Sequence, residues 1–168
     1  MDSYVQPALV LTSTVGCGLM AGTFFAFSAF VTRALASLPA PQGIAAFQSI
    51  NTTVLNPVFL GVFLGTAGLC IALGIHSVSS WSRPDAAWLL GGSLLYLLGN
   101  VVVTGVGNVP LNDALAAVDP ASAEAAKVWR DFLASWPGWN HVRTVTATAA
   151  MAAFMVGLIL SRAHDVAL

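Results

Sequence analysis

Long apolar runs separated by short polar segments dominate the chain, and this pattern predicts four membrane-spanning helices. The runs cover residues 8–31, 54–75, 86–106 and 142–160. Each has about the 20 residues that a helix needs to cross the hydrocarbon core of a bilayer. No Lys or Arg precedes the first run, which is also longer than the apolar core of a signal peptide, so we expect it to be a retained span.

The segment before the fourth run has the spacing of an amphipathic helix. Residues 121–136 combine an apolar side with a charged side, which predicts a helix lying at the membrane interface. Pro137 and Gly138 then predict a break, after which Asn140 would cap the fourth span. The expected fold class is all-α: an integral membrane four-helix bundle with an extra interfacial helix, forming a single domain over residues 1–168.

Composition agrees with a membrane protein and excludes several other classes. The chain is 57% hydrophobic and 8% charged, whereas soluble domains carry about 25% charged residues. A net charge of −1 offers no basic surface, so nucleic acid is not expected as a partner. Cys17 and Cys70 lie within apolar runs and are expected to be buried thiols. The three histidines are far apart in the sequence, so we predict no metal site and no cofactor.

Polar side chains recur at intervals of four residues in two places, so each set is expected to share one helix face. The sets are Gln48, Thr52 and Asn56 before the second span, and Asn100, Thr104 and Asn108 at the end of the third. Four spans put these sets, Asn112 and residues 139–143 at the same membrane face, where they would line a small-molecule pocket. Alternatively, these side chains hydrogen-bond between helices and only hold the bundle together. Lys and Arg occur on both sides of the membrane, so the orientation stays undetermined.

His141 and Arg143 are the candidate catalytic residues at that face. A histidine side chain ordinarily titrates near neutral pH, so it can both accept and release a proton. Arg143, together with the first N–H groups of the fourth span, would form a positive site for an anion or for an enolate oxygen. The alternative is that both side chains only anchor a helix end among the lipid headgroups.

Four motifs, in this order, resemble those of the anthrone oxygenase-like membrane family. They are GTFFAFSAFV, GIAAFQSINTTVLNPVF, GNVPLNDAL and the pattern W-x9-WNHVR that starts at Trp129. The resemblance covers nearly the whole chain. It implies a membrane monooxygenase that oxidises an anthrone, or another lipophilic polycyclic aromatic, with dioxygen and without a metal or flavin. Many members of the family are bacterial, which suggests a bacterial cell membrane as the location.

The resemblance also implies roles for individual residues. An anthrone is a flat ketone whose central carbon becomes acidic when its enolate is stabilised. His141 would be the base, and Arg143 with the amide of Asn108 or Asn112 would stabilise the enolate oxygen. The aromatic side chains that would stack on the substrate are Trp129, Trp139 and Phe24.

Two other functions fit the same residues. The protein could be a non-catalytic membrane binding or assembly protein, whose polar residues knit the helices together. A redox component that binds haem or quinone is a third hypothesis, which the low histidine count disfavours. The expected partners are the bilayer, a lipophilic small molecule and dioxygen. The glycine pairs Gly18/Gly22 and Gly61/Gly65 would also permit a homo-oligomer.

Overall fold

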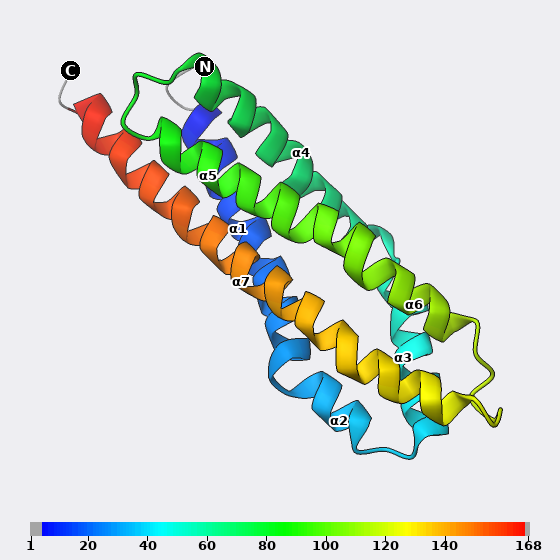
Figure 1. The fold of residues 1–168 in the computed structure, drawn as a ribbon. Coiled ribbons are helices and arrows are strands. Elements are labelled where there is room, and N and C mark those ends of the chain that lie inside the picture. The colour runs from blue at the N-terminus through cyan, green and yellow to red at the C-terminus, as the bar shows by residue number, and fades with distance from the viewer. Residues whose placement is uncertain (1–4, 167–168) are drawn as a thin grey trace.

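Four antiparallel helical rods make up the computed structural model, which describes residues 5–166, with side chains for residues 5–164 (Figure 1). The first rod consists of α1 (Val5–Ala26), the π-helix η1 (Phe27–Val31) and α2 (Thr32–Ala36). The second rod consists of α3 (Ala40–Val54) and α4 (Pro57–Ser79). The third consists of α5 (Ala86–Tyr96), the π-helices η2 (Leu97–Val102) and η3 (Thr104–Asn108), and α6 (Val109–Ala116). The fourth rod is a single helix, α7 (Ala125–Val166).

Each rod includes a helix long and apolar enough to cross a membrane, which confirms the predicted all-α bundle with four spans. The chain is therefore a multi-pass membrane protein. Both ends of the described chain lie at the same end of the bundle, as four spans require (Figure 1). The connections 37–39 and 117–124 lie at the opposite end.

The rods are longer than the bilayer is thick. With 42 residues, α7 is about 63 Å long, roughly twice the 30 Å of the hydrocarbon core. The end formed by α2, α3, α6 and the first part of α7 therefore extends out of the hydrocarbon. Most of the charged side chains belong to that end: Arg33, Asp113, Asp119, Glu124, Lys127, Arg130 and Asp131.

Two hydrophobic cores hold the bundle together. One lies among α1, α4, α5 and α7 in the spanning half, and it includes Leu73, Tyr96 and Phe154. The other lies between α3, α6 and the start of α7, and it includes Phe47 and Trp129. A candidate site lies between these two cores.

The glycines of the two predicted small-residue pairs make little contact inside the bundle. A Cβ atom added at Gly22, Gly61 or Gly65 would meet nothing within 4 Å, whereas one at Gly18 would lie 3.2 Å from the Met151 sulfur. Most of this small-residue surface therefore faces outward, and the homo-oligomer stays a prediction.

The predicted break at Pro137 and Gly138 is wrong, because α7 continues through both residues. Asn140 consequently lies inside a helix and caps nothing, and residues 121–136 do not form a separate interfacial helix. A proline in a helix removes the donor to a single carbonyl and clashes locally. Membrane helices tolerate this where neighbouring helices pack around it. Here the start of α7 packs into the second core through its aromatic side chains rather than lying along the membrane surface.

The shared face predicted for Gln48, Thr52 and Asn56 also fails, because α3 ends at Val54. The side-chain oxygen of Asn56 accepts hydrogen bonds from the backbone N–H groups of Val58 and Phe59, both at 3.0 Å. Asn56 is thus the N-cap of α4, and Pro57 takes the first helical position, where proline is favoured. An Asn-Pro pair therefore begins a new helix here instead of kinking an existing one.

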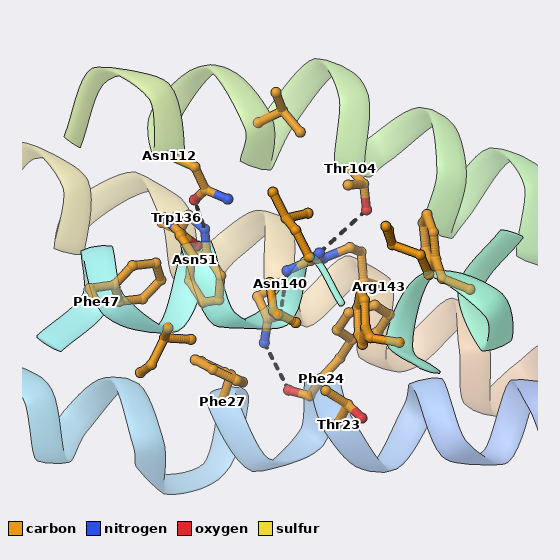
Figure 2. A pocket seen from close by; sticks show the side chains of 17 residues that line it. Thr23, Phe24, Phe27, Phe47, Asn51, Thr104, Asn112, Trp136, Asn140 and Arg143 are labelled. Carbon is orange, nitrogen blue, oxygen red and sulfur yellow. Dashed lines mark hydrogen bonds between the residues drawn. The ribbon is translucent and has the colours of Figure 1, made fainter. Parts of the chain in front are cut away.

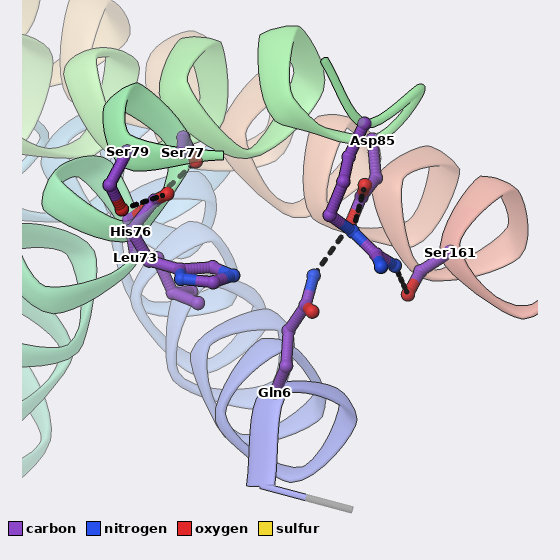
Figure 3. Close-up of polar contacts among 8 residues, drawn as sticks. Gln6, Leu73, His76, Ser77, Ser79, Asp85 and Ser161 are labelled. Atoms are coloured by element: carbon purple, nitrogen blue, oxygen red, sulfur yellow. Dashed lines mark hydrogen bonds and ion pairs between the residues drawn. The ribbon is translucent and has the colours of Figure 1, made fainter. Parts of the chain in front are cut away.

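A polar cluster ties three rods together at the end near the chain termini (Figure 3). Gln6 on α1 donates a hydrogen bond to the carboxylate of Asp85, which is 1% exposed. Arg83 donates from Nε to Asp85 Oδ1 at 3.1 Å and from Nη2 to Ser161 Oγ on α7 at 3.1 Å. Asp85 is therefore the shared acceptor of the cluster.

Replacing Asp85 with alanine is expected to destabilise the bundle by about 1–3 kcal/mol, because the buried Gln6 amide loses its acceptor. The measurement is the thermal unfolding midpoint in detergent micelles, followed by circular dichroism. Asp131→Ala is the matched control, since Asp131 pairs with Lys127 in solvent and such pairs contribute little. Equal midpoint shifts in the two variants would contradict the role given to Asp85.

Candidate functional site

A cavity of about 170 Å³ lies between the two cores, at the level where the second rod breaks. All four rods contribute to its walls. Its aromatic lining comprises Phe24, Phe27, Phe47, Phe59, Phe63 and Trp136. Its polar lining comprises Thr23, Asn51, Thr104, Asn112, Asn140 and Arg143.

The size of the cavity limits what it can hold. Engineered protein cavities of about 150 Å³ bind benzene, so this one has room for about one aromatic ring. Two of its lining residues, Leu55 and Val109, are 65% and 40% exposed and mark where it reaches the protein surface. A larger flat molecule would therefore extend toward this mouth.

Irregular helix geometry surrounds the cavity. The π-helix η1 contributes Phe27 and the π-helix η3 contributes Thr104. Such segments are rare and often occur at functional sites. Glycines inside the π-helices η2 and η3 let the third rod approach α7 closely: a Cβ atom at Gly99 would lie 2.3 Å from Thr146 Cβ, and one at Gly107 would lie 2.4 Å from the Trp139 ring.

Arg143 is a buried cation without a carboxylate partner. Its side chain is 7% exposed, and among residues 5–164 no Asp or Glu oxygen lies within ion-pair distance of its guanidinium. Nη2 donates to Asn140 Oδ1 at 2.8 Å, and Nη1 donates to Thr104 Oγ1 at 3.3 Å (Figure 2). A guanidinium has five N–H groups, so three have no acceptor among the residues that the structure describes, and the buried Nε is one of them.

Aromatic rings partly compensate this charge. The guanidinium carbon of Arg143 lies 4.2 Å from the ring centroid of Phe24 and 5.5 Å from that of Trp136. Cation–π contacts are attractive but leave the positive charge in place. The cavity thus combines flat aromatic walls with hydrogen-bond donors that suit an oxygen atom carrying negative charge.

Asn140 positions the guanidinium. It is fully buried, and its Nδ2 donates to the Phe24 carbonyl and to Ser28 Oγ, both at 2.8 Å. Its Oδ1 accepts from Arg143. The reversed amide would place the amide nitrogen against the guanidinium and the amide oxygen against a carbonyl, so only the observed orientation satisfies every group.

His141 lies outside the cavity. Its exposed ring lines a surface groove with Arg33 and Pro137, and its Nδ1 is 2.9 Å from Ser28 Oγ. Residues two positions apart in a helix point about 200° from each other, so His141 and Arg143 face opposite sides of α7. The pocket predicted to contain both side chains therefore does not form. A hydrogen-bond path through Ser28 and Asn140 connects them instead.

Comparison with known proteins identifies the family. The family model described as anthrone oxygenase matches residues 54–153, which is more than half of the chain. The chain belongs to the anthrone oxygenase family. Searches of curated proteins and of solved structures found no match.

The part of the chain that matches the anthrone oxygenase family contains most of the polar lining of the cavity. Thr104, Asn112, Asn140 and Arg143 lie within the matched residues. Thr23 and Asn51 precede them. The family model thus covers Arg143, the second and third spans completely, and the fourth span as far as residue 153.

Four of the site residues predicted from the sequence line the cavity: Phe24, Thr104, Asn112 and Arg143. Others lie elsewhere in this family member. Gln48 Nε2 donates to the carbonyls of Leu115 and Val118, both at 2.9 Å, and so closes the end of α6. Thr52 is exposed and bonds only to carbonyls of its own helix.

The remaining predicted residues do not line the cavity. Asn100 donates to Thr146 Oγ1 at 3.2 Å, and neither side-chain atom of buried Asn108 has a hydrogen-bond partner among the described residues. Trp129 stacks on Phe132 inside the second core, with ring centroids 5.6 Å apart. Trp139 covers Gly107 and is 40% exposed.

Trp136 and Asn51 are cavity residues that the sequence interpretation missed. Asn140 lies in the segment 139–143 that was expected to line the pocket, but its predicted role was only that of an N-cap. Trp136, Asn140 and Arg143 follow each other at i, i+4 and i+7, which places them on one face of a continuous helix. This spacing is present in the sequence. The predicted break at Pro137, however, would have separated Trp136 from the helix that carries Asn140 and Arg143.

Ionisable groups are scarce at the cavity. Arg143 is the only ionisable side chain among its lining residues. Among the described residues, no three His, Cys, Asp or Glu side chains gather closely enough to hold a metal ion.

Proposed function

We propose that this protein oxidises a flat aromatic ketone of the anthrone type with dioxygen, and that Arg143 stabilises the enolate of the substrate. One observation carries the proposal: a buried guanidinium without a carboxylate partner among residues 5–164 lines a cavity with aromatic walls. Family membership supports the same reaction type. The substrate's carbonyl oxygen would take N–H groups of Arg143 that have no acceptor among the described residues, and its rings would contact Phe24 and Trp136.

The reaction needs only the substrate and dioxygen. Loss of one proton from the methylene carbon forms the enolate, which transfers electrons to dioxygen, and a carbon–oxygen bond forms at that carbon. The resulting peroxide anion takes up a proton and becomes the hydroperoxide. Loss of the second C–H proton with cleavage of the O–O bond then yields the quinone and one water. One dioxygen is consumed per anthrone, with one oxygen atom in the quinone and the other in water.

The first proton has no basic acceptor on the cavity wall. In this proposal it leaves to water at the mouth near Leu55 and Val109, because Arg143 lowers the free energy of the enolate. His141 then has no direct contact with the substrate. It supports the site through Ser28 and Asn140, which is a positioning role rather than that of the base.

The test is anthrone turnover by the purified protein in detergent micelles. We expect one dioxygen consumed per quinone formed, at a rate well above that in buffer, with both followed at once by an oxygen electrode and by absorbance. His141→Ala should reduce kcat/KM by less than about tenfold, because the lost contact to Ser28 is a single hydrogen bond. A wild-type rate equal to that of buffer would refute the oxygenase proposal, and a much larger effect of His141→Ala would reinstate it as the base.

The lack of a base on the cavity wall favours one alternative, the binding of an aromatic oxyanion without turnover. In that case the protein would bind anthraquinone-type phenolates in an Arg143-dependent manner and leave anthrone unchanged. Binding and turnover measured on the same preparation distinguish the two functions.

A further inference from the structure

A second polar group of side chains lies in the same cavity, away from Arg143. Asn112 on α6 accepts a hydrogen bond at its Oδ1 from Trp136 Nε1 at 2.8 Å, and its amide N–H groups have no acceptor among the described residues. Asn51 on α3 makes no side-chain hydrogen bond to any described residue, and its Nδ2 is completely buried. Figure 2 shows Asn51 and Asn112 toward one end of the cavity and Arg143 and Thr104 toward the other.

An apolar side chain at position 51 would support the fold as well as Asn51 does. Gln48 and Asn56, its polar neighbours in sequence, each close a helix terminus by hydrogen bonds. Asn51 has no such bond although it lines the cavity. A buried amide N–H without an acceptor is unfavourable, and a ligand oxygen is the acceptor that the geometry allows.

We infer that the cavity selects aromatic molecules with two oxygen functions, a carbonyl or enolate oxygen at Arg143 and a hydroxyl or second carbonyl oxygen near Asn51 and Asn112. This inference rests on the proposed function and names the substrate class for it. The aromatic side chains between the two polar ends accept the flat ring system, and the two ends fix its direction. An unsubstituted anthrone has one oxygen atom, which would bind at Arg143 and leave Asn51 and Asn112 without a ligand oxygen.

The test uses stable flat ketones that cannot turn over, fluorenone with one oxygen and 2-hydroxyfluorenone with two. Their dissociation constants are measured in micelles by quenching of tryptophan fluorescence, in a buffer acidic enough to keep the phenol protonated. We expect wild-type protein to bind the hydroxylated ketone about 3- to 10-fold more tightly, the range of one neutral hydrogen bond. Asn51→Leu should bring that ratio to about one while leaving the affinity for fluorenone within a factor of about two.

Thr52→Val is the matched control, because Thr52 is the next residue of α3 and its side chain is exposed. It should keep the wild-type ratio. Asn51→Ala serves as a second variant, and thermal unfolding verifies that each variant is folded. Equal affinities of wild-type protein for the two ketones would overturn the inference, as would an unchanged ratio in both Asn51 variants. A ratio that falls equally in Thr52→Val would also overturn it.

Failure of this inference is distinguishable from failure of the proposed function. Turnover of unsubstituted anthrone depends on Arg143 and not on the Asn51 end. If anthrone is oxidised but the two ketones bind equally, only the inference is wrong. If the hydroxyl preference is present but no anthrone is oxidised, the oxygenase proposal is wrong and the two-ended binding site stands.

Discussion

Replacing Arg143 with methionine is expected to lower kcat/KM for anthrone oxidation by about 10²- to 10³-fold, the loss typical of removing one preorganised donor from an oxyanion site. The bundle should lose little stability. Methionine keeps the contact with Phe24 and Trp136, and it removes a charge that no carboxylate among the described residues compensates. Desolvating such a charge costs several kcal/mol, which offsets the hydrogen bond that buried Asn140 Oδ1 loses.

The measurement combines turnover with the thermal unfolding midpoint of the same preparation. Arg33→Met is the control, because Arg33 is an exposed arginine on α2 away from the cavity. Lost activity at unchanged or raised stability would identify Arg143 as a functional residue. If Arg143→Met kept wild-type turnover, the enolate-stabilising role would be excluded. If it unfolded the bundle, the arginine would be a packing residue.

Placing a carboxylate next to Arg143 is expected to lower the activity as well. Thr104 Oγ1 accepts from Arg143 Nη1, so Thr104→Asp would place a carboxylate against the guanidinium. Opposite charges about 4 Å apart near a protein surface attract by about 4 kcal/mol, and the substrate enolate would have to compete with this pair. We expect kcat/KM to fall by on the order of a hundredfold.

Thr104→Val is the matched variant, since it removes the same hydroxyl without adding charge. The lost 3.3 Å hydrogen bond is a weak one, so activity should fall by only a few-fold. Similar activities of the Asp and Val variants would show that the unpaired charge of Arg143 is not what the reaction uses. Circular dichroism spectra of both variants verify that the helices are retained.

The four spans and their location in lipid follow from the sequence because they depend on local composition. Runs of about 20 apolar residues partition into lipid whatever they later contact, and span number then determines that the termini share one side. Part of the site was predictable for the same reason. Arg143 and Asn112 are polar groups close to the end of an apolar run, and topology alone brings them to one membrane face.

The direction of each side chain required the tertiary structure. A helix interrupted at Pro137 and a continuous one put the same residues on different faces, and neighbouring helices decide which occurs. The continuous α7 separates His141 from Arg143 and joins Arg143 with Asn140 and Trp136. Likewise, the π-helices of the first and third rods add a residue to a turn, which shifts side chains away from the α-helical spacing used in the prediction.

The sequence by itself determined that this is a four-span, all-α membrane protein of the anthrone oxygenase family with its polar chemistry near one membrane face. Only the tertiary structure decided which polar groups share a cavity and which lie outside it. Arg143, Asn51 and Asn112 line that cavity, whereas His141 and Gln48 do not. The physical reason is that an apolar run partitions into lipid because of its own composition. The direction in which a side chain points from its helix axis depends instead on every break and π-helical turn that precedes it in the helix.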